Sequence, residues 1–139
     1  MPKLNNLVAF QRAVDLTVEV YELTRSLPKQ ELYGLTSQMR RAAMGVASNI
    51  AEGQGRLTYG EWRQFLSQAR GSLFEVEAQA MVAERLGFFT SEQQVRIATS
   101  VRKTGKALFG LIRWVKSQER RPSKPRSPET SQPLTEGRD

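Results

Sequence analysis

Apolar residues recur at intervals of three and four along most of the chain, which is the spacing of helices that bury one face. The densest instance is residues 38–56, QMRRAAMGVASNIAEGQGR. One face of that helix, begun just upstream, holds Leu35, Met39, Ala42, Ala43, Val46, Ile50 and Gly53. Small residues let a neighbouring backbone come close, so this helix is expected to pack on more than one side. Gly53 and Gly55 predict its end.

A polar strip follows one flank of the same helix and contains Gln38, Gly45, Asn49, Glu52 and Arg56. Asn49 and Glu52 are one turn apart, as are Glu52 and Arg56. A partly buried strip would need its polar groups paired with one another or with a neighbouring helix. A solvated flank is the other interpretation, and the sequence leaves both open.

The first predicted helix, residues 6–26, carries an unusually wide apolar arc. One seam contains Leu7, Phe10, Val14, Thr17, Tyr21 and Thr24, and a second contains Ala13, Leu16, Val20, Leu23 and Leu27. Pro28 ends the helix, and residues 29–34 form a loop. A bundle helix needs a narrower arc, so part of this surface is expected to contact a neighbouring subunit.

The third predicted helix, residues 59–86, has an unbroken seam of Trp62, Leu66, Ala69, Leu73, Val76, Ala80 and Ala83. Thr58 and Glu61 predict a capping box at its start. An outward apolar stripe of Phe74, Ala78 and Met81 lies on the other side. Contiguous exposed apolar residues usually mark an interface, so we expect a homo-oligomer that contacts through this stripe.

The fourth predicted helix, residues 92–119, has a seam of Ala98, Val101, Gly105, Leu108, Ile112 and Val115, with a capping box at Ser91 and Gln94. No segment alternates as a strand would. The pattern predicts an all-α fold, an up-down-up-down antiparallel four-helix bundle over residues 1–119. Residues 120–139 are basic and rich in proline and serine, and predict a disordered C-terminal tail.

These residues also resemble a known family. The stretches QMRRAAMGVASNIAEGQGR, EWRQFLSQARGSLFEVEAQ and ERLGFF, with FQRAVDLTVEVYELTRSLP upstream, are similar to the bacterial four helix bundle proteins, also called 23S rRNA intervening-sequence or S23-like proteins. The chain departs from the family pattern at Ala47, where proline is common, and at Phe10, where tryptophan is common. The resemblance implies assembly into rings, with five subunits. It points to nucleic acid as a partner without defining an activity.

The composition removes the usual catalytic groups. The chain has no cysteine and no histidine, so it lacks thiolate chemistry, the commonest general base and the commonest metal ligand. We therefore expect no enzyme activity, no catalytic residue, no metal and no cofactor. No run of about 18 apolar residues is present, so no membrane partner is expected, and the lack of cysteine suits the cytoplasm.

The net charge of +7 favours an acidic partner, nucleic acid first. The fourth helix concentrates this charge in a stripe of Arg102, Lys106, Phe109, Arg113, Lys116 and Arg120, with Lys103 beside it. The stripe spans about 27 Å at 1.5 Å per residue. It suits a phosphate backbone, with Phe109 available for stacking. A solvated helix face is the other interpretation. Arg40, Arg41, Arg63 and Arg70 are expected mainly to pair with acids on the first or third helix.

Two hypotheses of function follow from these features. The leading one is a non-enzymatic, oligomeric protein that binds RNA or DNA as an accessory protein of the rRNA intervening-sequence type. The alternative is a protein-interaction scaffold that binds no nucleic acid, such as an accessory subunit of a reverse transcriptase, a role implied only by the family resemblance.

Overall fold

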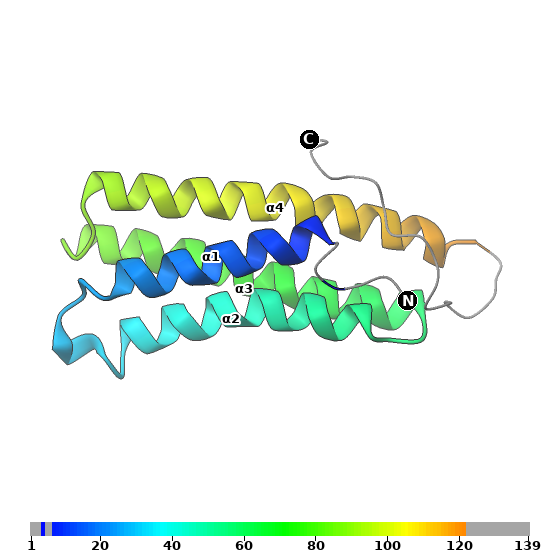
Figure 1. Cartoon of the computed structure of the whole chain (residues 1–139), viewed down its shortest axis with the longest axis horizontal. Helices are drawn as coiled ribbons and strands as arrows, with labels where there is room; N and C mark the ends of the chain where they lie inside the picture. The colour runs from blue at the N-terminus through cyan, green and yellow to red at the C-terminus, as the bar shows by residue number, and fades with distance from the viewer. Residues whose placement is uncertain (1–3, 5–6, 122–139) are drawn as a thin grey trace.

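The computed structural model describes residue 4 and residues 7–121. It contains four helices, α1 (Val8–Thr24), α2 (Leu35–Gln54), α3 (Tyr59–Arg85) and α4 (Ser91–Glu119), and a short 3-10 helix, η2 (Lys29–Glu31). Successive helices run in opposite directions, and α1 packs on both α2 and α4 while α3 packs on the same two helices (Figure 1). The prediction of an all-α up-down-up-down bundle is confirmed. The predicted tail lies, from residue 122 onward, outside the described residues.

The core forms where the predicted seams meet. Every predicted seam residue of α3 is buried, as is the second predicted seam of α1. The first predicted seam of α1 divides between core and surface. Thr17 and Thr24 are buried, whereas Val14 and Tyr21 are each 39% exposed. The wide apolar arc of α1 therefore extends beyond what the bundle itself covers.

The buried face of α4 is rotated from the predicted one. Ala98 is exposed and Ile97 is buried in its place, while Ile112 is only partly buried and Leu111 is fully so. The observed seam contains Ile97, Val101, Thr104, Leu108, Leu111 and Val115. This phase buries Ile97 in place of the smaller Ala98, which removes more apolar area from water, and exchanges Ile112 for Leu111 of the same size.

Threonine side chains cap the N-termini of α3 and α4. The Thr58 hydroxyl accepts a hydrogen bond from the Glu61 backbone N–H at 3.1 Å, which is one half of the predicted capping box. The other half differs, because the Glu61 carboxylate accepts from the Thr58 hydroxyl at 3.3 Å and not from the Thr58 backbone. The capping box of α4 lies one residue earlier than predicted and uses Thr90 with Gln93, because the helix begins at Ser91. The prediction of Ser91 with Gln94 is therefore wrong.

The turn after α3 is a Schellman motif. The Phe88 N–H donates to the Ala83 carbonyl at 2.9 Å and the Gly87 N–H donates to the Glu84 carbonyl at 3.0 Å. Gly87 has a φ of 79°, which a residue with a Cβ rarely adopts. The chain then reverses, and the buried Phe89 anchors the start of α4 in the core.

The helices α2 and α3 approach each other closely at Gly53. The prediction that Gly53 and Gly55 mark the end of α2 is confirmed, because the helix ends at Gln54 and Gly55 is its C-cap. A Cβ at position 53 would lie 2.6 Å from a ring carbon of Trp62 and 3.2 Å from the Trp62 carbonyl oxygen. Trp62 is fully buried and fixed among Tyr59 and Trp114. Gly53 is therefore required by packing rather than by the turn.

Two buried threonines tie α1 to its neighbours. The Thr17 hydroxyl bonds the Ala43 carbonyl of α2 at 3.1 Å. The Thr104 hydroxyl of α4 bonds the Arg12 carbonyl of α1 at 3.2 Å. Each hydroxyl also reaches the carbonyl one turn back in its own helix. These bonds fix the register of α1 against both helices that flank it.

We expect Gly53→Ala to lower the free energy of unfolding by about 1–3 kcal/mol, because the added methyl meets a fixed ring and backbone. Urea unfolding measures this change. Gly105→Ala is the matched control, since Gly105 is also buried in a helix but a Cβ there meets Leu73 at an ordinary 3.5 Å. The control is expected to keep or gain stability, by up to about 1 kcal/mol from helix propensity. Equal losses in both variants would contradict the packing role of Gly53.

Candidate nucleic-acid interface

The cationic stripe of α4 lies on the outer surface of the bundle. We use "α4 stripe" for Arg102, Lys106, Phe109, Arg113, Lys116 and Arg120. All five cations are exposed, and α4 carries six cations against the two acids Glu92 and Glu119. Glu119 is already paired with Arg63 of α3 at 2.7 Å. The stripe therefore has little neutralising charge on its own helix.

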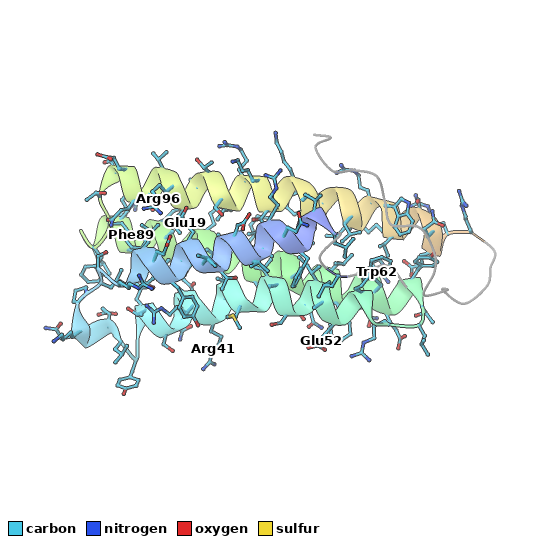
Figure 2. All side chains as sticks on the ribbon, viewed as in Figure 1. Glu19, Arg41, Glu52, Trp62, Phe89 and Arg96 are labelled. Carbon is cyan, nitrogen blue, oxygen red and sulfur yellow. The ribbon has the colours of Figure 1, made fainter. Side chains whose placement is uncertain are left out.

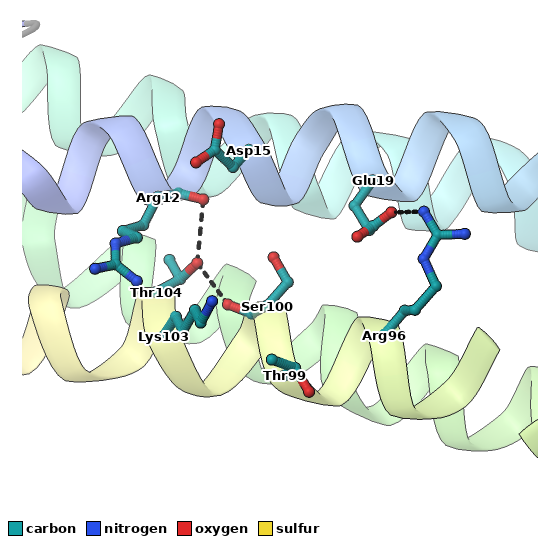
Figure 3. Close-up of a pocket in the computed structure, with 8 residues that line it drawn as sticks. All are labelled: Arg12, Asp15, Glu19, Arg96, Thr99, Ser100, Lys103 and Thr104. Atoms are coloured by element: carbon teal, nitrogen blue, oxygen red, sulfur yellow. Dashed lines mark hydrogen bonds and ion pairs between the residues drawn. The ribbon is translucent and has the colours of Figure 1, made fainter. Parts of the chain in front are cut away.

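Four of the five cations of the stripe form no ion pair with any residue that the structure describes. Within residues 4 and 7–121, none of Arg102, Arg113, Lys116 and Arg120 forms an ion pair. Lys103, predicted beside the stripe, lacks one in the same part of the chain and lines a notch between α4 and α1 (Figure 3). Exposed cations without a carboxylate partner are the groups that neutralise backbone phosphates.

The aromatic member of the stripe is less accessible than the sequence suggested. Phe109 is half-buried, and its ring centroid lies 6.4 Å from that of Phe74 on α3. The Arg70 guanidinium lies over both rings, at 5.4 Å from Phe109 and 5.6 Å from Phe74. Phe109 therefore supports a stacked arginine, and the planar Arg70 group adds a cation from α3 beside the stripe.

The other arginines pair differently from expectation. Arg63 pairs with Glu119 of α4, not with an acid of the first or third helix. Arg40 lies 4.5 Å over the Tyr21 ring and donates to the Thr24 hydroxyl at 2.9 Å. Arg41 points away from α2 (Figure 2). The prediction of acid pairing on the first or third helix is wrong for Arg63, because α4 presents the nearer carboxylate.

The predicted polar strip of α2 is largely a surface feature. Glu52 and Arg56 form an ion pair at 3.6 Å, with both side chains about half exposed. Asn49 donates to the Gly45 carbonyl at 2.9 Å. The Arg56 guanidinium lies 4.4 Å over the Phe65 ring of α3, so the strip joins α2 to α3 at its edge.

The predicted oligomer residues lie on the surface of α3. Phe74 is 48% exposed, Met81 is 50% exposed, and Ala78 between them is also exposed. Val82 extends the same stripe and was not singled out from the sequence. Gly71 lies one turn before Phe74, and a Cβ there would meet no atom within 4 Å. No close contact inside the bundle requires this glycine.

Neither a membrane-spanning helix nor an acidic metal site is found among the described residues. No helix among them is long and apolar enough to cross a membrane. Residues 4 and 7–121 also contain no group of three acidic side chains placed to hold a metal ion.

The fold is thus an antiparallel four-helix bundle with a cationic face on its last helix. The model of the 23S rRNA-intervening sequence proteins matches residues 5–110, and the chain belongs to this family. None of the curated proteins matches the chain.

A solved structure shares the fold. It is a protein of unknown function of the S23 ribosomal protein family from Bacteroides thetaiotaomicron, with a TM-score of 0.68 and 19% sequence identity. The match covers 76% of this chain and 98% of that one. At this identity the likeness concerns the fold alone.

Proposed function

We propose that the protein is a non-enzymatic, cytoplasmic accessory protein that binds RNA or DNA through the α4 stripe. The observation that carries the proposal is the row of exposed cations on α4, of which Arg102, Arg113, Lys116 and Arg120 form no ion pair within residues 4 and 7–121. Membership of the 23S rRNA-intervening sequence family supports a link to RNA.

The geometry favours contact with a phosphate backbone over reading of bases. The cations of the stripe are spread along about 27 Å of one helix, so they follow a strand and do not converge on a pocket. Arg70 offers a planar group stacked on Phe109 beside them, and such a guanidinium can stack on an unpaired base. Binding is therefore expected to depend strongly on salt and weakly on sequence.

The apolar faces support assembly and also favour a second candidate, a protein-binding scaffold. One face consists of Val14, Val18, Tyr21 and Met44 on α1 and α2, and the other of Phe74, Ala78, Met81 and Val82 on α3. Two different faces that contact each other make a heterologous interface, which closes into a ring when the rotation allows it. We propose that copies of the chain assemble in this way, with the subunit number of five taken from the family resemblance.

Repetition of the chain around a ring would raise the local density of cations from the α4 stripes, which strengthens the attraction of the assembly for a phosphate backbone.

Changing Arg102, Lys106 and Arg113 together to Glu is expected to abolish RNA and DNA binding without changing helicity. Each reversal removes two units of charge, so the net charge falls from +7 by 6 to +1. Arg25, Arg41 and Arg85 changed to Glu make a matched control with the same net charge and are expected to keep most of the binding. Fluorescence anisotropy and circular dichroism measure the two properties. Equal binding by both variants would reject the α4 stripe as the site.

Met81→Glu is expected to turn the assembled protein into monomers, because a buried charge without a partner opposes association. Val95→Glu is the control, since Val95 is also exposed, at 62%, but lies outside both apolar faces. Light scattering at micromolar concentration reports the mass. A monomeric wild-type protein would contradict the proposed assembly.

A further inference from the structure

A polar notch lies between α1 and α4, apart from the α4 stripe. Its volume is about 420 Å³, and it is lined by Arg12, Asp15, Glu19, Arg96, Thr99, Ser100, Lys103 and Thr104 (Figure 3). The two helices are distant in sequence, so no short sequence motif predicts this site. Lys103 was predicted as a cation beside the α4 stripe, whereas Arg12 was not predicted to lie near it.

Fixed contacts build both ends of the notch. At one end, the fully buried Thr104 hydroxyl joins the Arg12 carbonyl at 3.2 Å to the Ser100 carbonyl at 2.8 Å. At the other end, Arg96 of α4 forms an ion pair with Glu19 of α1 and reaches Glu22 at 3.7 Å. The spacing of α1 and α4 along the notch is therefore set before any ligand arrives.

Two of the three cations that line the notch, Arg12 and Lys103, are available to a ligand. Within residues 4 and 7–121, neither Arg12 nor Lys103 forms an ion pair, although Arg12 is partly buried. Figure 3 shows both side chains beside Thr104. The Ser100 hydroxyl points from α4 toward α1 and makes no hydrogen bond in the same part of the chain. Two cations and a hydroxyl donor thus come from two helices to one place.

The acidic residues that line the notch disfavour the binding of an anion less than their number suggests. Glu19 is neutralised by Arg96, and the Asp15 carboxylate points away from α4 in Figure 3. A cationic ligand would have to approach between Arg12 and Lys103. The arrangement of donors therefore selects an anion.

We propose that this notch binds a phosphate group, held by the Arg12 guanidinium, the Lys103 ammonium and the Ser100 hydroxyl. Guanidinium and ammonium groups make strong charge-assisted bonds to phosphate oxygens, and hydroxyls add a further donor. A nucleic-acid backbone and a free oligophosphate both present this chemistry. Binding of a nucleic-acid backbone in the notch rests on the proposed function, and the backbone would then continue from the α4 stripe across to α1. Binding of a free oligophosphate does not depend on the proposed function.

The test compares Arg12→Gln/Lys103→Gln with the wild-type chain in titrations with inorganic triphosphate and with a single-stranded RNA at low salt. The control is Arg25→Gln/Lys29→Gln, which removes the same two charges at exposed positions outside the notch. The notch variant is expected to bind triphosphate about tenfold or more weakly, as loss of charge-assisted hydrogen bonds implies, and the control is expected to bind as the wild type does. Circular dichroism verifies that both variants stay folded.

The outcomes separate this proposal from the proposed function. Parallel weakening of triphosphate and RNA by the notch variant alone supports a backbone phosphate in the notch. Weakening of triphosphate alone supports a free phosphorylated ligand, whatever the α4 stripe does. No triphosphate binding by the wild type, or equal effects in the notch variant and the control, would overturn the proposal, even if the α4 stripe binds RNA.

Discussion

The close approach of α2 and α3 is the constraint on which the rest of the bundle depends. Gly53 leaves room for the Trp62 ring, and Gly45 brings the same two helices together at Ser72, where a Cβ would lie 2.8 Å from the hydroxyl oxygen. Trp62 in turn contacts Trp114 of α4, with ring centroids 5.8 Å apart. The packing of α2 on α3 therefore helps to set the position of α4, which carries the cationic surface.

The sequence predicted what depends on local periodicity and missed what depends on distant partners. The α3 seam, from Trp62 to Ala83, repeats without a break, so the prediction of the buried face of α3 was correct at every position. Along α4, Ala98 and Ile97 offer two phases of similar quality, and only the packing between α1 and α3 decides between them. Gly53 was placed on the buried face and near the end of its helix, but nothing near it in sequence reveals the contact with the Trp62 ring.

The candidate sites follow the same division. Four-three spacing on one helix was enough to place the cations of the α4 stripe on a common surface. It could not show that Phe109 leans on Phe74, or that Arg70 of α3 covers both rings. The notch depends on Arg12 meeting α4 across the bundle, so no single segment of the chain contains it.

Cationic and apolar side chains thus occupy different parts of the outer surface of the bundle. Exposed cations extend along α4, and Arg12 and Lys103 lie where α4 meets α1, whereas apolar side chains lie on α3 and on the face shared by α1 and α2. A subunit arranged in this way can contact copies of itself through apolar faces and leave its cations to an acidic partner. This separation lets assembly and phosphate binding be tested by different substitutions.

The measurement that tests phosphate binding most directly is the affinity of the full chain for a short labelled RNA and a matching DNA duplex across a salt series. We predict submicromolar binding at low salt that weakens steeply as salt rises, with a logarithmic slope of about 0.7 per phosphate contacted on a single strand and about 0.9 on the duplex. Absence of binding to either nucleic acid at low salt would contradict the proposed function and leave the protein-binding scaffold as the better explanation of the bundle.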